Sequence, residues 1–185
     1  MKKLISRGVL KLMGWKVIGN IPTAKKYIII VAPHTSNWDF VVGRCFGYLL
    51  EIKAKFFGKS QLFRFPFGWL FRLMGGIPVD RAKHNNLVSF AIDLFNVSDE
   101  LVIGLAPEGS RSSVEAWKLG FYHIAVGANI PIAVSFLDYQ KKEAGIGFMF
   151  KPSGNLSQDL KKIEAFYQTI SPKYSEKYNP KIGVL

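Results

Sequence analysis

Short runs of consecutive apolar residues alternate along the chain with longer stretches in which apolar residues recur every three or four positions. The short runs are rich in β-branched and aromatic residues, which is typical of buried strands. We expect strands at Tyr27–Val31, Ala54–Phe57, Ile77–Val79, Leu101–Leu105, Ile132–Leu137 and Ile146–Phe150. The periodic stretches predict helices at Trp38–Leu50, Gln61–Met74, Asn85–Asn96, Trp117–Ala128 and Leu156–Thr169. This alternation indicates a single α/β domain over residues 1–185, with a mixed, mostly parallel sheet flanked by helices on both faces.

The two ends of the chain differ from this alternating core. Residues 1–14 have the pattern of a basic amphipathic helix. Its apolar face consists of Leu4, Ile5, Val9, Leu12 and Met13. Two interpretations stay open: the helix lies on a bilayer, or it packs its apolar face on the core and leaves its basic face in water. The polar tail 171–185 contains prolines, and we expect it to be loosely held.

The composition narrows the classes of partner. The formal net charge is +12, and the chain contains 15 Phe, 7 Tyr and 4 Trp. Such a positive surplus favours an acidic partner, which can be nucleic acid, anionic lipid, a phosphorylated substrate or an acidic carrier protein. Aromatic residues mixed with Lys and Arg are typical of a membrane–water interface, and also of proteins that stack on nucleic-acid bases. A single cysteine, Cys45, rules out a disulfide within the chain and is compatible with a reducing compartment.

The apolar segments predict contact with a membrane surface and no membrane span. No apolar run reaches the ~18 residues of a transmembrane helix. The segment 56–76 carries six Phe, one Trp, two Arg and one Lys, and its aromatic residues cannot all face inward on one helix. We expect some of these rings to enter lipid while Arg64 and Arg72 meet lipid phosphates; the alternative is an aromatic-rich core helix. We therefore expect a cytoplasmic protein that associates peripherally with the inner, anionic face of the cell membrane.

Charged and polar residues follow three of the predicted strands. The first strand is followed by APHTSNWDF, which contains His34 and Asp39. The third is followed by a segment with Arg81, and the fourth by APEGSRSS, with Glu108 and Arg111. In α/β sheets, sites gather at the carboxyl ends of the strands. We therefore expect these side chains to converge on one rim of the sheet.

His34 and Asp39 are spaced as a base and its partner would be. Ser36 or Asn37 can cap a helix that begins just after them, and this places Asp39 in the first helical turn, where it can fold back toward His34. A carboxylate on one imidazole nitrogen fixes the tautomer and leaves the other nitrogen to take a proton from a hydroxyl. The alternative is a strand-to-helix turn with a polar cap and no chemical role.

The PEGSR segment suits an anionic ligand. Gly109 permits a tight backbone turn, and Ser110 and Arg111 supply donors for a phosphate, whose geometry matches the guanidinium fork. Glu108 can orient the arginine or accept a hydrogen bond from a substrate hydroxyl. The alternative is a surface turn with a local ion pair.

Four blocks, HTSNWD, GGIPVDR, PEGSR and NIPIAV, occur in this order between Val31 and Val134. Together they resemble the glycerolipid (1-acylglycerol-3-phosphate) acyltransferase family, with its His-x4-Asp and Glu-Gly-Thr-Arg blocks. WKLG, at residues 117–120, resembles the Phe-Lys-x-Gly that commonly follows the third block in that family. Ser110 departs from the usual Thr, and Pro78-Val79 stands where the family commonly has Phe-Ile.

The resemblance implies a glycerolipid-acyltransferase-like fold and a role for each matching residue. It makes His34 the general base and Asp39 its partner, and it associates Pro131, in the fourth block, with the acyl-donor side. The residues that it implies for binding the acceptor's phosphate and glycerol are Arg81, Glu108, Gly109, Ser110 and Arg111.

The function that the resemblance implies is transfer of a fatty acyl group from an acyl thioester to the free hydroxyl of a lysophospholipid, in phospholipid biosynthesis. Acyl-CoA or acyl carrier protein would be the cosubstrate, with no other cofactor. No metal site is expected, because His84 and His123 have no cysteine or carboxylate at ligand spacing. The alternatives are an acyltransferase for another lysolipid, such as one with an amino-acid head group, or an inactive basic protein that binds lipid or nucleic acid. We favour the enzyme with no nucleic-acid partner, since the His-x4-Asp pair is intact.

Overall fold

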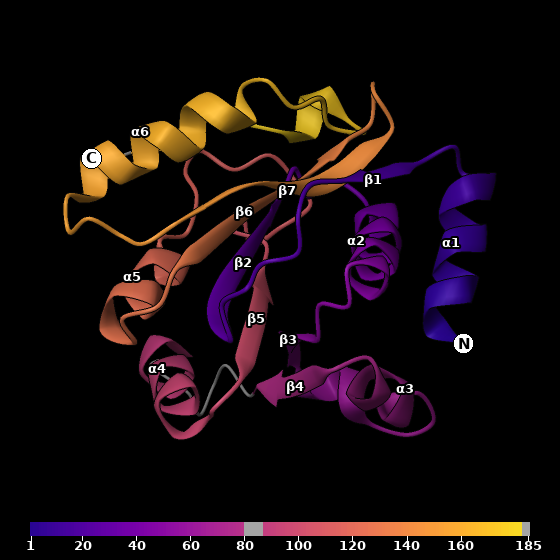
Figure 1. Cartoon of the computed structure of the whole chain (residues 1–185), viewed down its shortest axis with the longest axis horizontal. Helices are drawn as coiled ribbons and strands as arrows, with labels where there is room; N and C mark the ends of the chain where they lie inside the picture. The colour runs from indigo at the N-terminus through magenta and orange to yellow at the C-terminus, as the bar shows by residue number, and fades with distance from the viewer. Residues whose placement is uncertain (80–86, 183–185) are drawn as a thin grey trace.

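The computed structural model describes residues 1–79 and 87–182 and centres on one twisted sheet (Figure 1). The strands of this sheet follow the order β1-β7-β6-β2-β5-β3-β4. They are β1 (Lys16–Ile18), β2 (Lys26–Ala32), β3 (Ala54–Lys59), β4 (Gly76–Val79), β5 (Leu101–Leu105), β6 (Ile132–Asp138) and β7 (Glu143–Phe150). β6 and β7 pair antiparallel, and every other pair is parallel. The expected mixed, mostly parallel sheet is confirmed.

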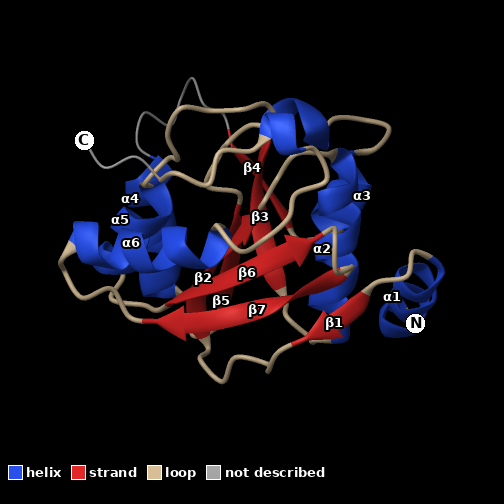
Figure 2. Ribbon diagram, turned by 90° about the horizontal axis from the view of Figure 1, so that it is seen from above, coloured by secondary structure: helices blue, strands red, loops and turns tan. Residues whose placement is uncertain are grey.

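Helices cover both faces of the sheet, as the sequence predicts. They are α1 (Lys2–Leu12), α2 (Asn37–Leu49), α3 (Gly68–Leu73), α4 (Leu87–Val97), α5 (Gly120–Gly127) and α6 (Leu156–Tyr167), with short 3-10 turns η1 (Ser60–Phe63) and η2 (Ser175–Lys177). Figure 2 shows α4, α5 and α6 on one side of the sheet and α1, α2 and α3 on the other. The α/β layering therefore follows from the spacing of the strand and helix patterns.

The central strand β2 is apolar on both faces because it is covered on both. Its residues Ile28 and Ile30 belong to a core with Phe95, Phe121 and Leu160, which come from the α4, α5 and α6 side. Tyr27 and Ile29 point the other way, into a smaller core that contains Leu10, Val42 and Phe46 of α1 and α2. A strand buried on both faces reads as a continuous apolar run, which is what Tyr27–Val31 shows.

The register of three parallel strands creates the edge where the site lies. Ile30 of β2 lies beside Leu105 of β5, and Ala32 of β2 lies beside Phe136 of β6. Because these strands run in the same direction, the segments that follow them leave the sheet at the same edge. This edge is called the carboxyl rim below.

One strand was not predicted. β1 has only three residues, of which the outer two are exposed, and it pairs only with β7 at the end of the sheet. Such a short run on an edge carries no apolar alternation that a sequence pattern could reveal.

The predicted helix Gln61–Met74 was wrong in its extent. The structure divides it into η1 and α3, separated at Phe65–Pro66. Proline lacks an N–H for the helical ladder, and Gly68 lies so close to the backbone of Phe63 that a Cβ would come within 2.0 Å of the Phe63 carbonyl oxygen. Phe63 is buried, but most of the apolar residues around it are not. The exposed ones are Leu62, Phe65, Phe67, Trp69, Leu70 and Leu73.

The amphipathic helix α1 contacts the domain through a face other than its most apolar one. Ser6 and Leu10 are its buried residues. Leu4 and Leu12 are 73% and 90% exposed, and Ile5 is exposed as well. The interpretation in which the helix packs on the domain's own core therefore holds for Leu10 and Met13, but not for Leu4, Ile5 and Leu12. None of the helices in residues 1–79 and 87–182 is long and apolar enough to span a membrane.

The tail is not loosely held over its described part, which corrects the expectation for residues 171–182. The indole N–H of Trp117 donates to the carbonyl oxygen of Asn179 at 2.9 Å, and the N–H of Ile182 donates to the Glu164 carboxylate at 3.0 Å. Ile182 is fully buried in the larger core. A buried apolar anchor of this kind outweighs the polar composition of the segment around it.

Candidate active site

The turn between β2 and α2 places His34 at the carboxyl rim. Ser36 is the N-cap of α2, and its hydroxyl accepts a hydrogen bond from the N–H of Trp38 at 3.0 Å. Asp39 completes a capping box by accepting from the N–H of Ser36. The predicted cap and the predicted fold-back of Asp39 are both confirmed, because the polar residues after the strand satisfy the free N–H groups of the helix start.

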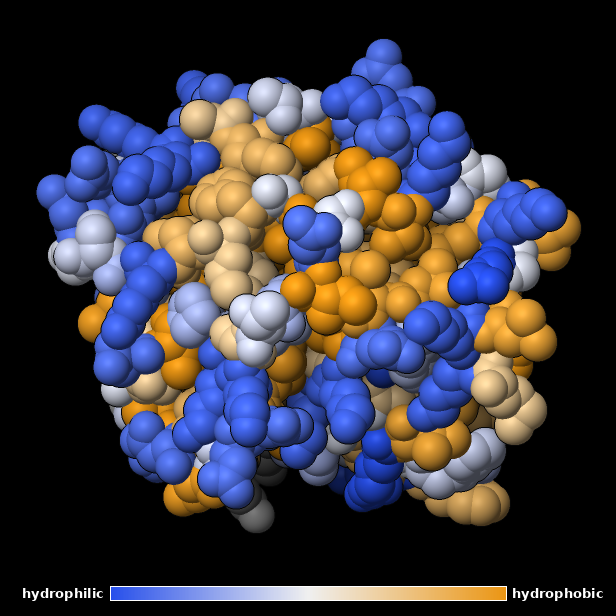
Figure 3. Space-filling model, in the orientation of Figure 1, coloured by the Kyte–Doolittle hydropathy of each residue, from blue (hydrophilic) through white to orange (hydrophobic). Residues whose placement is uncertain are grey.

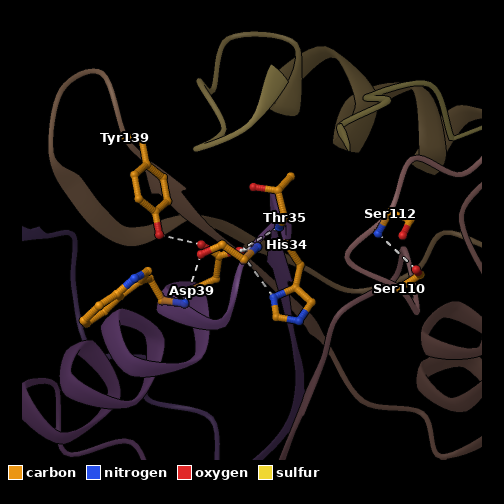
Figure 4. A network of polar contacts seen from close by, with 8 residues as sticks. His34, Thr35, Asp39, Ser110, Ser112 and Tyr139 are labelled. Carbon is orange, nitrogen blue, oxygen red and sulfur yellow. Dashed lines mark hydrogen bonds and ion pairs between the residues drawn. The ribbon is translucent and has the colours of Figure 1, made fainter. Parts of the chain in front are cut away.

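Both oxygens of the Asp39 carboxylate accept hydrogen bonds (Figure 4). Its Oδ2 accepts from the backbone N–H groups of Thr35 and Ser36, each at 2.6 Å. Its Oδ1 accepts from the hydroxyl of Tyr139 at 2.5 Å. Both oxygens of this buried carboxylate therefore have hydrogen-bond partners, which hold its position beside His34.

His34 directs one ring nitrogen at this carboxylate. Its Nδ1 lies 3.6 Å from Oδ2 of Asp39, and its side chain is 24% exposed. The separation is an ion-pair contact, longer than a full hydrogen bond. Burial lowers the pKa of His34, the nearby Asp39 carboxylate opposes that shift, and the Arg111 guanidinium adds to it. The imidazole is therefore biased toward its neutral form, which is the form a general base needs.

Glu108 lies buried beside this pair and forms no ion pair with a described residue. Neither carboxyl oxygen has a hydrogen-bond partner in the part of the chain that the structure describes, and the residue is 4% exposed. Burial raises the pKa of Glu108 to about 8, and the Asp39 charge adds to this shift. The backbone N–H of His34 lies close enough to oppose the shift, although it falls outside hydrogen-bonding geometry. The alternative of a surface ion pair with Arg111 is wrong, and the carboxyl group is mostly neutral at pH 7.

The turn after β5 carries the expected anion donors. Gly109 has a φ of +67°, so the predicted tight turn is confirmed. Ser110 and Arg111 are exposed next to it, and the Ser110 hydroxyl accepts from the N–H of Ser112 at 3.1 Å. Lys118 is a residue that the sequence analysis did not select. Its side chain packs against the turn so closely that a Cβ at position 109 would lie 3.0 Å from its Cδ.

Two predicted site residues are not brought to this rim by the described structure. Arg81 lies outside the described residues. Pro131 directly precedes β6, and its carbonyl oxygen accepts from the N–H of Ile28 near the start of β2. The proline therefore lies at the amino edge of the sheet, opposite to His34, and any effect of this block on the acyl donor would have to act through the strand that follows it.

Tyr139 is a member of the site that the sequence analysis missed. It directly follows β6, so the rule that sites gather at strand carboxyl ends could have selected it. Its phenol is held by Asp39, and burial, followed by that hydrogen bond, raises its pKa. The phenol therefore stays protonated and continues to donate to the carboxylate.

The arrangement provides a base, its orienting carboxylate and a cation at one rim. Nδ1 is the ring nitrogen of His34 that faces Asp39, so the tautomer with its proton on Nδ1 leaves Nε2 for a substrate hydroxyl. Within residues 1–79 and 87–182, no three His, Cys, Asp or Glu side chains are grouped as metal ligands would be.

Two known enzymes are similar to this chain in sequence. The 1-acyl-sn-glycerol-3-phosphate acyltransferase of Streptococcus pneumoniae is 32% identical over 120 residues, which are 58% of this chain and 43% of that protein. The enzyme of the same name from Saccharomyces cerevisiae is 35% identical over 130 residues, 63% of this chain and 40% of that protein. The matched regions thus span less than half the length of these relatives.

A solved structure shares the fold. The crystal structure of the 1-acyl-sn-glycerophosphate (LPA) acyltransferase PlsC from Thermotoga maritima superposes with a TM-score of 0.63 at 19% identity, over 92% of this chain and 80% of that one. The family model described as Acyltransferase matches residues 15–135, a range that includes His34, Asp39 and the turn at Gly109. On the evidence of that match, the chain belongs to the acyltransferase family.

Proposed function

We propose that this protein transfers a fatty acyl group from a thioester, acyl-CoA or acyl carrier protein, to the free hydroxyl of 1-acylglycerol-3-phosphate. The observation that carries the proposal is the contact of His34 with the fully hydrogen-bonded Asp39 at a rim that also presents Arg111. The enzymes from Streptococcus pneumoniae and Saccharomyces cerevisiae are both 1-acyl-sn-glycerol-3-phosphate acyltransferases, which supports the choice of acceptor.

The reaction follows from the orientation of the imidazole. Nε2 of His34 takes the proton of the acceptor hydroxyl while the oxygen attacks the thioester carbonyl. The tetrahedral intermediate collapses, the C–S bond breaks, and the thiolate leaves with the proton returned from the imidazolium. During these steps Asp39 balances the positive charge that forms on the ring, and it can do so without moving because backbone N–H groups and Tyr139 hold it.

The acceptor's phosphate would bind on the side of the turn after β5. Arg111 is exposed there, and its charge is close enough to lower the pKa of His34. Lys118 packs on the same turn and adds a second cation. Glu108, held mostly neutral at pH 7, adds little negative charge that would repel the phosphate.

A thiol-release assay tests the proposal. Purified protein with palmitoyl-CoA or palmitoyl carrier protein and lysophosphatidate in mixed micelles is expected to release one free thiol for each phosphatidate formed. Omitting the lysophosphatidate should stop thiol release. Thiol release that continues without acceptor and yields free fatty acid would show a thioesterase and overturn the proposal.

We also propose that the protein docks peripherally on the anionic inner face of the cell membrane. The support is an exposed apolar surface with basic neighbours, here called the apolar edge. It consists of Leu4, Ile5 and Leu12 of α1 and Phe65, Phe67 and Trp69 at α3. Figures 1 and 2 place both helices on the same side of the sheet as α2, and Figure 3 shows apolar side chains between hydrophilic ones along that edge. Apolar groups beside Lys and Arg are what an anionic bilayer surface binds.

Vesicle flotation tests this docking. Replacing Phe65 and Trp69 by serine should weaken binding to vesicles of phosphatidylglycerol and phosphatidylcholine by roughly a hundredfold, measured as the loss of floating protein, since each of the two rings loses ~1.5 kcal/mol or more of burial. Val97→Ser is the matched control, because Val97 is 82% exposed at the end of α4, on the other side of the sheet. Wild-type flotation of the double variant would contradict the proposal.

A further inference from the structure

Lysines and aromatic rings alternate on the surface next to the catalytic carboxylate. The Nζ of Lys173 lies 5.6 Å from the ring centre of Trp38, 5.9 Å from that of Tyr139 and 5.4 Å from that of Tyr174. Two further lysines extend this arrangement. Lys177 lies over Tyr174 at 4.6 Å, and Lys142 lies over Trp15 and Tyr139 at 5.5 and 5.6 Å. These residues form the lysine–aromatic cluster.

The cluster carries positive charge that no carboxylate of residues 1–79 and 87–182 pairs with. Lys141, next to it, pairs with Asp138 at 3.5 Å. Lys142, Lys173 and Lys177 form no ion pair with any carboxylate of the described residues. The rings restrict where the ammonium groups can lie, through cation–π attraction, but they add no negative charge. Figure 3 shows hydrophilic side chains gathered at the upper right, where Figure 1 places the β6–β7 turn. The cluster is therefore free to attract an anion.

The position of the cluster relates it to the reaction. Tyr139 belongs to the cluster and also donates to Asp39, and Trp38 directly precedes Asp39 in α2. Figure 4 shows Tyr139 on one side of the His34–Asp39 pair and Ser110 on the other. Two cationic surfaces thus flank the base: the turn with Arg111 on one side, and the lysine–aromatic cluster on the other.

We propose that the lysine–aromatic cluster binds the phosphate end of the acyl donor. The inference rests on the proposed function, which requires two anionic molecules to meet at His34. The acceptor carries its phosphate close to the hydroxyl that reacts. The donor, whether a CoA or a carrier-protein thioester, carries phosphate at the far end of its pantetheine arm. Arg111, whose charge acts on His34, therefore suits the acceptor's phosphate. The cluster lies farther from His34, beyond Asp39 and Tyr139, and suits the donor's phosphate.

Donors with and without phosphate test the assignment. The triple variant Lys142→Gln/Lys173→Gln/Lys177→Gln is expected to raise KM for palmitoyl-CoA and palmitoyl carrier protein about fivefold or more, with a weaker dependence on salt than wild type. KM for S-palmitoyl-pantetheine, which has no phosphate, and KM for lysophosphatidate should not change. The matched control is Lys25→Gln/Lys53→Gln/Lys161→Gln, which removes the same charge from exposed positions that precede β2 and β3 or lie on α6.

Direct binding separates this assignment from the proposed function. Calorimetric titration with CoA and with pantetheine needs no turnover, and the triple variant should lose affinity for CoA alone. If the wild type bound CoA but transferred no acyl group, the proposed function would fail while the binding assignment stood. Four results with the triple variant would each overturn the assignment. In the kinetic assays these are a rise in KM for lysophosphatidate and an equal rise in KM for the phosphate-free donor. In the binding assays they are unchanged CoA binding, and weaker vesicle flotation with an unchanged donor KM.

Discussion

Replacing His34 by alanine is expected to lower kcat for acyl transfer by roughly 10²–10⁴-fold, which is the usual contribution of a general base. The change removes the group that takes the proton from the acceptor hydroxyl in the proposed mechanism, and it leaves the capping box at Ser36 and Asp39 intact. Thiol release at saturating concentrations of both substrates is the measurement. His123→Ala is the matched control, since His123 is an exposed histidine on α5. Wild-type turnover by the His34 variant would contradict the mechanism.

The pH profile gives an independent test of the same group. Burial lowers the pKa of His34 in the folded protein, so activity should rise with pH through a midpoint below the ~6.5 of an ordinary histidine. The positive charge of Arg111 lowers the pKa of His34, so Arg111→Gln should move the midpoint to higher pH. The negative charge of Asp39 raises the pKa of His34, so Asp39→Asn should move the midpoint to lower pH. The same variant should also slow turnover. Shifts in the same direction for both variants would show that the midpoint does not belong to His34.

Replacing Glu108 by glutamine is expected to change how stability depends on pH. The pKa of Glu108 is raised from 4.5 to about 8, so between these values the folded protein holds a proton that the unfolded chain releases. The free energy of unfolding of the wild type should therefore fall as pH rises through this interval, by up to ~1.4 kcal/mol per pH unit from this group, and level off above it. Urea unfolding of both proteins at pH values from 5 to 9 measures the difference between them.

The difference between wild type and Glu108→Gln isolates this group from His34. The lowered pKa of His34 has the opposite consequence: its contribution is present above the unfolded pKa of ~6.5 and is lost as pH falls toward the folded value. The same histidine is present in both proteins, so to a first approximation its effect cancels. We expect the glutamine variant to be the more stable of the two above pH 8, where the wild type holds a buried charge without a partner among the described residues. Parallel stability curves would contradict the raised pKa.

Much of the fold could be predicted because buried positions are apolar and recur with the period of the strand or helix that carries them. The run Tyr27–Val31 indicates a strand covered on both faces, and the structure buries Ile28 and Ile29 in different cores. The cap at Ser36 and the turn at Gly109 could be predicted from single residues whose backbone preferences are strong. The break inside Gln61–Met74 was not predicted, although Pro66 marks it, because the apolar spacing on both sides favours one helix.

The site was predictable only in part. His34, Asp39 and the turn at Gly109 lie within a few residues of predicted strand ends, so the sequence points to them. Tyr139 is distant from Asp39 in sequence, and only the parallel pairing of β2 with β6 brings its hydroxyl to the carboxylate. The charge state of Glu108 was not predictable either, since a carboxyl group next to an arginine in sequence suggests an ion pair.

The sequence by itself determined the α/β layering, the cap that fixes the start of α2, and the residues that we propose as base and partner. Those features depend on residues that are near one another along the chain, so their spacing can be read directly from the sequence. Only the tertiary structure decided that Leu4, Ile5 and Leu12 of α1 point outward and that Glu108 is buried without a described partner. It also decided that lysines and aromatic rings from the residue before β1, from α2, from the β6–β7 turn and from the tail gather beside Asp39. These depend on which surfaces exclude water from one another, and strand register sets that between segments far apart in the chain.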